Sequence, residues 1–158
     1  GMKICTACKQ ELPEKDFEIT SNPKGKYFRS VCKSCRTKIA NRKKSSSPEK
    51  YLRHLYTQAK SARRNSGIEW NIEAIDIVAL WHEQDGKCAL SGVFMTWQKD
   101  GGGRKELNAS IDRIDPHNGY LPNNVQLVCS RVNILKHNLT EDELYWWCKN
   151  IITLKELN

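Results

Sequence analysis

The stretch that decides the fold runs Ser110-Ile-Asp-Arg-Ile-Asp-Pro-His-Asn-Gly-Tyr-Leu-Pro-Asn-Asn-Val-Gln-Leu-Val-Cys-Ser-Arg-Val-Asn-Ile-Leu-Lys136. Residues 110–114 alternate in polarity as a short strand does, and residues 124–128 alternate again. Pro116-His-Asn-Gly119 predicts a turn between them, because proline presets φ and Asn-Gly tolerates a positive φ. Residues 132–136 then fit a helical period. The pattern therefore predicts a strand, a turn, a second strand and a helix.

This pattern resembles the ββα-metal fold of the HNH (His-Me finger) nucleases. In that family an Asp-His pair ends the first strand, an Asn opens the second, and an Asn or His lies on the helix. The matching residues here are Asp112-Arg113, Asn124 and Asn133. The resemblance implies that Asp112 and Asn133 hold one Mg²⁺ or Mn²⁺ ion, and that Asn124 fixes the loop between the strands. Oxygen ligands suit such a cation, which keeps several waters and is shared with substrate phosphates.

The chain departs from the family pattern at the general base. The usual base, the His after the Asp, is Arg113 here, and an arginine stays protonated. One branch of the family, which includes a rare-cutting restriction endonuclease and phage proteins, also carries Arg at this place. A Tyr is proposed to act instead in that branch, and the matching residue is Tyr120. His117 is the alternative base, because an unperturbed imidazole titrates near neutral pH.

Composition favours a polyanionic partner. The 158 residues carry a net charge of +8, a balance typical of nucleic-acid-binding proteins, although it also serves solubility. There is no long apolar run and no apolar leader. We therefore expect a protein of the cytoplasm, in a bacterium or a phage-infected host cell, with no membrane partner.

Two Cys-x-x-Cys pairs predict a structural Zn²⁺ site within residues 1–45. Cys5-Thr-Ala-Cys8 and Cys32-Lys-Ser-Cys35 can present four thiolates as a zinc ribbon does. Asn22-Pro-Lys-Gly25 between them predicts a hairpin turn. Because so short a segment buries little apolar surface, the metal would supply much of its stability. The order of these residues also resembles the N-terminal ribbon of phage recombination endonucleases.

Residues 46–86 predict a connector of two helices. Pro48 fits the first turn of a helix that runs to residue 65, with a preceding serine as its cap and Gly67 as its stop. A second helix is expected over 72–83. The residues expected to face inward are Leu52, Leu55, Tyr56 and Ala59 in the first helix, and Ile75, Val78 and Ala79 in the second.

The opposite face of the first helix is basic. One basic face on an amphipathic helix is typical of a phosphate-binding surface, and a simply solvated face is the alternative. We therefore expect double-stranded DNA as the partner. The residues expected to contact it are Arg53, Lys60, Arg63, Arg64, Arg131 and Lys136.

Residues 87–158 are expected to form the catalytic module. In many relatives a second zinc site includes the positions of Cys88 and Cys129, but Ser91 and Val132 stand where its other two cysteines would be. Cys88 and Cys129 are therefore expected to be buried and to face each other. Residues 99–105, which include three glycines in a row, predict a flexible insert.

The closing helix is expected to begin with a capping box at Thr140-Glu-Asp-Glu143. Leu144, Trp147, Cys148, Ile151 and Leu154 recur at helical spacing and predict a core-facing stripe, with Cys148 in the core.

The sequence thus predicts an α+β protein: a small zinc ribbon, a helical connector and a ββα-metal module. The function implied by the resemblance is metal-dependent cleavage of DNA. The alternative is a zinc-stabilised nucleic-acid-binding protein whose HNH site is degenerate and inactive. Cleavage of both strands by so small a site would favour a homodimer.

Overall fold

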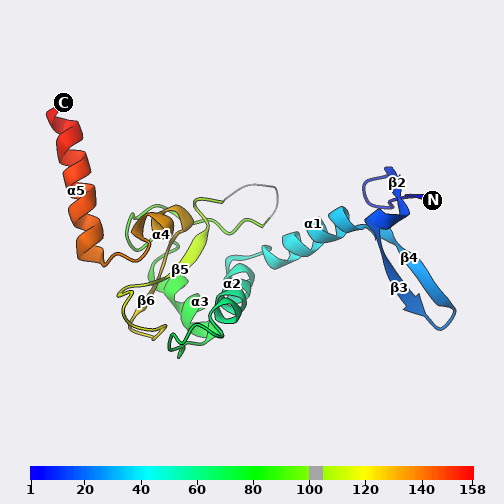
Figure 1. Cartoon of the computed structure of the whole chain (residues 1–158), viewed down its shortest axis with the longest axis horizontal. Coiled ribbons are helices and arrows are strands. Elements are labelled where there is room, and N and C mark those ends of the chain that lie inside the picture. Colours follow the sequence, from blue (N-terminus) through cyan, green and yellow to red (C-terminus); the bar gives the residue numbers. More distant parts are fainter. Residues whose placement is uncertain (100–104) are drawn as a thin grey trace. The chain divides into compact units, whose positions relative to one another are not determined.

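The computed structural model describes residues 1–99 and 105–158. It is a mixed α+β structure whose described residues form three two-stranded antiparallel sheets. The chain divides into two compact units, one mainly of residues 1–46 and the other mainly of residues 47–158 (Figure 1). Residues 100–104 of the predicted insert lie outside the described residues. No described helix is both long and apolar enough to cross a membrane.

The first unit consists of two hairpins and a helix. Its turn at Asn22–Gly25 forms as expected, since the Asn22 side chain accepts a hydrogen bond from the Lys24 amide at 2.8 Å and Gly25 has a φ of 127°. Phe17, Cys5 and Cys32 are its buried apolar residues. The elements are β1 (Met2–Ile4), β2 (Glu11–Pro13), the 3-10 turn η1 (Glu14–Asp16), β3 (Phe17–Asn22), β4 (Gly25–Cys32) and α1 (Lys33–Lys44).

The second unit contains the expected ββα element. Its two strands pair in a register that sets Asp112 opposite Gln126, and a helix follows the second strand directly (Figure 1). The strand, turn, strand and helix predicted from the deciding stretch are therefore confirmed. The elements are α2 (Pro48–Ala62), α3 (Ala74–Glu83), β5 (Ala109–Arg113), β6 (Val125–Cys129), α4 (Ser130–Lys136) and α5 (Glu141–Leu157).

One hydrophobic core joins α2 and α3 to the β5–β6 hairpin. Leu52 of α2, Ile77 of α3 and Leu127 of β6 are fully buried in it. The Tyr51 hydroxyl donates a hydrogen bond to the carbonyl of Ala109 at 3.0 Å, which ties α2 to the start of β5. The residues expected as a connector thus share a core with the residues expected as the catalytic module.

The helix starts are set by local capping. Ser47 caps α2 and accepts a hydrogen bond from the Lys50 amide at 3.2 Å, with Pro48 in the first turn as predicted. The helix ends at Ala62, however, and Gly67 lies beyond the turn that follows it, with a φ of 74°. The stop therefore comes several residues before the glycine that was expected to cause it.

The predicted inward face of α3 is partly wrong. The helix begins at Ala74, because Glu73 and Asp76 form a reciprocal capping box. It packs through Ile77 and Val78, whereas Ile75 is 58% exposed and Ala79 is also exposed.

The predicted core stripe of α5 is also wrong. Thr140 caps the helix and Leu144 is buried, but Trp147, Ile151 and Leu154 are more than half exposed. Cys148 is exposed as well, so it is not a core residue. Helical spacing shows which residues share a face, but within the described residues only the Leu144 end of that face of α5 is covered.

Candidate functional site

A pocket of about 610 Å³ lies at the ββα element. It brings together four of the residues predicted for catalysis and metal binding: Asp112, Arg113, Tyr120 and Asn133. They come from the end of β5, from the loop after it and from α4, so the hairpin register and the α4 helix set their spacing. Its other lining residues are Arg63, Ser110, Ile111, Pro116, Ser130, Ile134, His137 and Asn138.

The centre of the site is a buried ion pair. Asp112 is 5% exposed, and its two carboxylate oxygens lie 3.1 and 2.9 Å from the Lys136 ammonium. Lys136 is fully buried and also donates to the carbonyls of Arg113 at 2.6 Å and Ile114 at 3.2 Å. These contacts use its three N–H donors within the protein. The expectation that Lys136 contacts DNA is therefore wrong.

Gln126 forms a second layer behind the carboxylate. Its side-chain amide donates to Asp112 Oδ2 at 3.0 Å and to Glu141 Oε1 at 2.9 Å. Oδ2 of Asp112 therefore accepts from both Gln126 and Lys136, whereas Oδ1 accepts from Lys136 alone. Since each carboxylate oxygen offers two lone pairs, Oδ1 keeps acceptor capacity that these contacts do not use.

The orientation of Asn133 follows from its neighbours. Its amide nitrogen donates to the hydroxyl of Ser110 and, at 3.3 Å, to the carbonyl of Ile111. A carbonyl only accepts, so the nitrogen must face Ile111. The amide oxygen of Asn133 is then the group left for a ligand in the pocket that Asn133 and Asp112 line together.

Asn124 does not line this pocket but holds the loop that does. It is buried, its amide oxygen accepts from the Asp115 backbone at 2.9 Å, and its amide nitrogen donates to the carbonyls of Asp115 and Gly119 at 3.0 and 2.9 Å. The Asp115 carboxylate in turn accepts from the His117 amide at 2.9 Å and from the Asn118 side chain at 3.2 Å. Asp115 therefore stabilises the turn, and these contacts do not join it to Arg113.

Tyr120 is held in place by the segment between α2 and α3. Its amide donates to the carbonyl of Glu69 at 2.8 Å, and its carbonyl accepts from Asn71 at the same distance. Its ring lies 4.5 Å from that of Trp70. A Cβ at Gly119 would come within 2.6 Å of the Glu69 carbonyl oxygen. The glycine is thus needed for this close approach and not, as expected, for a positive φ, which it lacks.

Two arginines lie over the Tyr120 ring. The guanidinium of Arg113 is 5.3 Å from the ring centroid and that of Arg63 is 6.0 Å, both within cation–π range. Arg113 also donates to the carbonyl of Asn118 at 3.1 Å. Both arginines line the pocket, so positive charge surrounds the carboxylate site.

The two histidines nearest the site differ in position. His117 lies exposed in the turn and does not line the pocket. His137 lines it, directly after α4, with a φ of 48°. An L-residue adopts this conformation at a cost, which is typical of functional sites. His137 was missed in the sequence, where its only signal is its place next to Lys136.

The residues predicted to bind DNA differ in their surroundings. Arg53, Lys60, Arg63 and Arg64 are exposed on α2 or just after it, and Arg63 also lines the catalytic pocket. Arg131, by contrast, forms an ion pair with Glu106.

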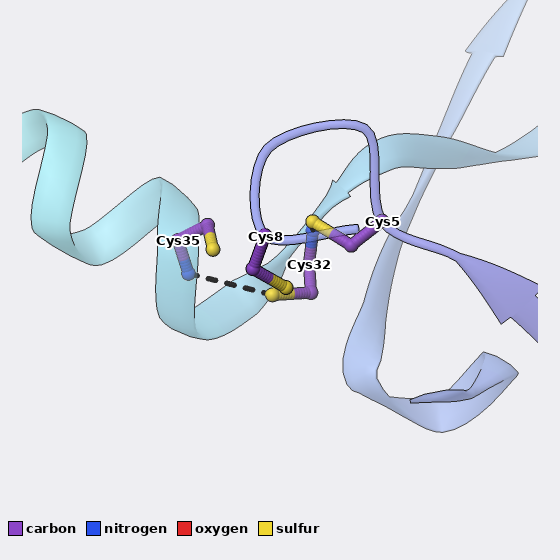
Figure 2. A group of neighbouring side chains, drawn as sticks. All are labelled: Cys5, Cys8, Cys32 and Cys35. Atoms are coloured by element: carbon purple, nitrogen blue, oxygen red, sulfur yellow. Dashed lines mark hydrogen bonds between the residues drawn. The ribbon is translucent and has the colours of Figure 1, made fainter. Parts of the chain in front are cut away.

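In the first unit, the four cysteines of the two Cys-x-x-Cys pairs converge. The sulfurs of Cys5, Cys8, Cys32 and Cys35 all lie within 4.8 Å of one another (Figure 2). The Cys35 amide points to the Cys32 sulfur at 3.5 Å, and the Cys32 amide to the Cys5 sulfur at 3.3 Å. Four thiolates at this spacing could hold a tetrahedral metal ion.

The same contacts set the acidity of the thiols. Backbone hydrogen bonds from Cys32 and Cys8 lower the pKa of the Cys5 thiol to about 6. A hydrogen bond with the Cys32 side chain, together with burial, raises the pKa of the Cys35 thiol to about 12. The Cys5 sulfur is therefore largely a thiolate at neutral pH and can bind a cation in that form.

Cys88 and Cys129 are both buried in the core of the second unit, as expected. Burial and the neighbouring Cys88 raise the pKa of the Cys129 thiol to about 11. Cys129 is therefore a neutral thiol at physiological pH and packs as a small apolar group.

No protein-family model matches the sequence, and no curated protein matches it. Among solved structures, the chain is similar to one described as the rare-cutting HNH restriction endonuclease PacI, which exhibits an extraordinary mechanism of DNA perturbation. The TM-score is 0.47 at 18% identity, over 95% of this chain and 93% of that chain. At this score and identity the likeness does not assign the chain to a family.

Proposed function

We propose that the chain is a metal-dependent endonuclease that hydrolyses phosphodiester bonds in double-stranded DNA. The observation that carries this proposal is the convergence of Asp112, Arg113, Tyr120 and Asn133 on one pocket. These residue types supply what such a reaction needs: ligands for a cation, a fixed positive charge and an ionisable group.

The donor set fits a hard divalent cation. Asp112 Oδ1 has unused acceptor capacity, and the Asn133 amide oxygen is left for a ligand. Two oxygen ligands with waters completing the shell suit Mg²⁺ or Mn²⁺. The chemistry supplied by the bound cation would be neutralisation of charge on the scissile phosphate and on the departing oxygen.

Side chains of the protein would stabilise the developing charge, accept the proton and position the loop. Arg113 is a permanent cation, and its planar guanidinium suits the negative charge that develops on the phosphate oxygens. Tyr120 or His137, which both line the pocket, would take a proton from the attacking water. Asn124 would act as a positioning residue, since it holds the loop and not the reacting atoms.

Arg63 links the site to the expected DNA surface. It lines the pocket and lies just after α2, whose exposed face carries Arg53 and Lys60. Among the described residues, none of these three side chains forms an ion pair. Free cations beside a carboxylate site would hold the DNA backbone across the pocket.

One observation favours the second candidate, a zinc-stabilised DNA-binding protein with an inactive site. The Lys136 ammonium already neutralises Asp112, and this lowers the attraction of the carboxylate for a second cation. In both candidates the four-cysteine cluster would hold a structural Zn²⁺, because a site closed by four thiolates leaves no position for a substrate.

Plasmid cleavage distinguishes the two candidates. We expect the protein to convert supercoiled plasmid to nicked or linear DNA at low salt with Mg²⁺ or Mn²⁺, and not with EDTA. Asn133→Ala should abolish cleavage but keep plasmid retardation in a gel, and the exposed Asn123→Ala should cut like the parent. Plasmid that is retarded but uncut under all metal conditions would contradict the proposed nuclease activity and support the inactive DNA-binding protein.

A further inference from the structure

Helix α5 exposes an unusual amount of apolar surface. Of its 17 residues, Leu144 alone is buried, whereas Trp147 is 53% and Ile151 is 64% exposed. Trp146 packs edge-on against Trp147, so the aromatic surface is continuous. Large exposed apolar patches mark interaction sites more often than free surface.

The helix also lacks the packing that normally stabilises a helix of this length. In proteins most of the stability of a helix comes from the packing of its apolar face, and aromatic and β-branched residues are weaker helix formers than alanine or leucine. The segment Tyr145-Trp-Trp-Cys-Lys-Asn-Ile-Ile-Thr153 is rich in such residues. A partner on its apolar face would therefore stabilise the helix itself.

The apolar residues form a stripe suited to a second helix. Leu144, Trp147, Cys148, Ile151 and Leu154 follow the three- and four-residue spacing of one face, which we name the α5 stripe. Lys149 and Thr153 lie on the opposite side of the helix by the same geometry. A stripe of this kind packs against a similar stripe on a neighbouring helix.

The charges along α5 complement those of a second, antiparallel copy. Its first turn carries Glu141, Asp142 and Glu143, and its last turn carries Lys155, which lies beside the stripe, and Glu156, which lies on the opposite side of the helix. Antiparallel pairing brings the acidic turn of each copy towards Lys155 of the other, whereas parallel pairing brings like charges together. Antiparallel helix dipoles add to this preference.

We propose that the α5 stripe binds the α5 stripe of a second copy of this chain in an antiparallel helix pair. The stripe is centred near residue 149, so Trp147 of one copy would lie against Ile151 of the other, while Leu144 stays buried within its own chain. The interface is self-complementary, as a two-fold dimer requires. This inference does not depend on the proposed nuclease activity.

The test is the molar mass of the zinc-loaded full chain, measured by sedimentation and light scattering across a wide range of concentration. We expect the parent to be a dimer, Ile151→Glu to be a monomer at the same concentrations, and the opposite-face control Thr153→Glu to remain a dimer. Thermal melting checks that the variants fold, since Ile151 makes little contact with the core. Trp147→Glu repeats the test at a second position.

Lys155→Glu tests the direction of the pair. It should weaken the antiparallel dimer, because it sets two acidic turns against acidic partners, and the effect should shrink with added salt. An unchanged dimer would favour parallel pairing and overturn the antiparallel arrangement. A parent that stays monomeric throughout, or an Ile151→Glu variant that still dimerises, would overturn the proposal as a whole.

Discussion

At the scale of single residues, the pairing of Asp112 with Lys136 governs both the site and the fold. The two charges lie in the interior, and the two backbone carbonyls at the end of β5 complete the hydrogen bonding of the ammonium. A buried pair of this kind adds little net stability by itself, but breaking it leaves an uncompensated charge. The carboxylate proposed to bind metal is thus also a structural group.

Removal of Lys136 should therefore destabilise the second unit strongly. We expect Lys136→Met to lower its free energy of unfolding by about 3–5 kcal/mol, because the buried Asp112 loses its counter-charge. The measurement is urea unfolding followed by tryptophan fluorescence. The matched control is Lys149→Met at an exposed lysine of α5, which should change the stability by less than about 0.5 kcal/mol. Equal stability of the two variants would contradict the role given to the ion pair.

The general base can be identified by three variants. Tyr120→Phe keeps the ring contacts with Trp70 and Arg113 but removes the hydroxyl, so its cleavage rate should fall by roughly 10²–10⁴ if the phenol is the base. His137→Gln should have that effect if the imidazole is the base. His117→Gln serves as the control and should cut normally, since His117 lies outside the pocket. A large loss in His117→Gln alone would show that the loop moves when DNA binds.

At the scale of elements, the four-cysteine cluster should make the first unit depend on metal and on pH. Thiols must lose their protons to bind Zn²⁺, so affinity falls as pH falls. Zinc should therefore be released as the pH falls and the four cysteines take up protons.

Zinc release can be followed with a chromogenic chelator during acidification, and the structure of the first unit by circular dichroism. The second unit, whose core holds no member of the cluster, should keep its thermal transition after chelation at neutral pH. Loss of both transitions together would show that the metal stabilises the whole chain.

Elements set by neighbouring residues were predictable from sequence. The Ser47 cap and the Asn22–Gly25 turn depend on contacts two or three residues apart, and both form as expected. The β5–β6 hairpin also forms as expected, although it pairs residues as far apart as Ala109 and Cys129. The exposed faces of α3 and α5 were not predictable, because spacing shows which residues share a face but not whether anything covers it. Lys136 is the instructive case: it fits the apolar period of α4, yet a lysine in a last turn is usually exposed.

At the scale of the molecule, the four-cysteine cluster and the pocket at the ββα element lie in different units. The cysteine cluster belongs to residues 1–46, whereas every residue that lines the pocket comes from residues 47–158. Sequence motifs identified both groups, because the spacing of cysteines and of the ββα residues is local. The place of Arg63 in the pocket, and the contacts by which residues 69–71 hold Tyr120, arise only from tertiary packing, and no motif marks them.

The contact of residues 69–71 with Tyr120 has a consequence for how this chain can vary. Tyr120 is paired on both sides of its peptide to Glu69 and Asn71, and Gly119 leaves no space for a side chain there. An insertion or deletion between α2 and Trp70 would shift that pairing and move the tyrosine away from Asp112. The position of Tyr120 therefore constrains the length of this connecting segment, although the segment carries no proposed catalytic group.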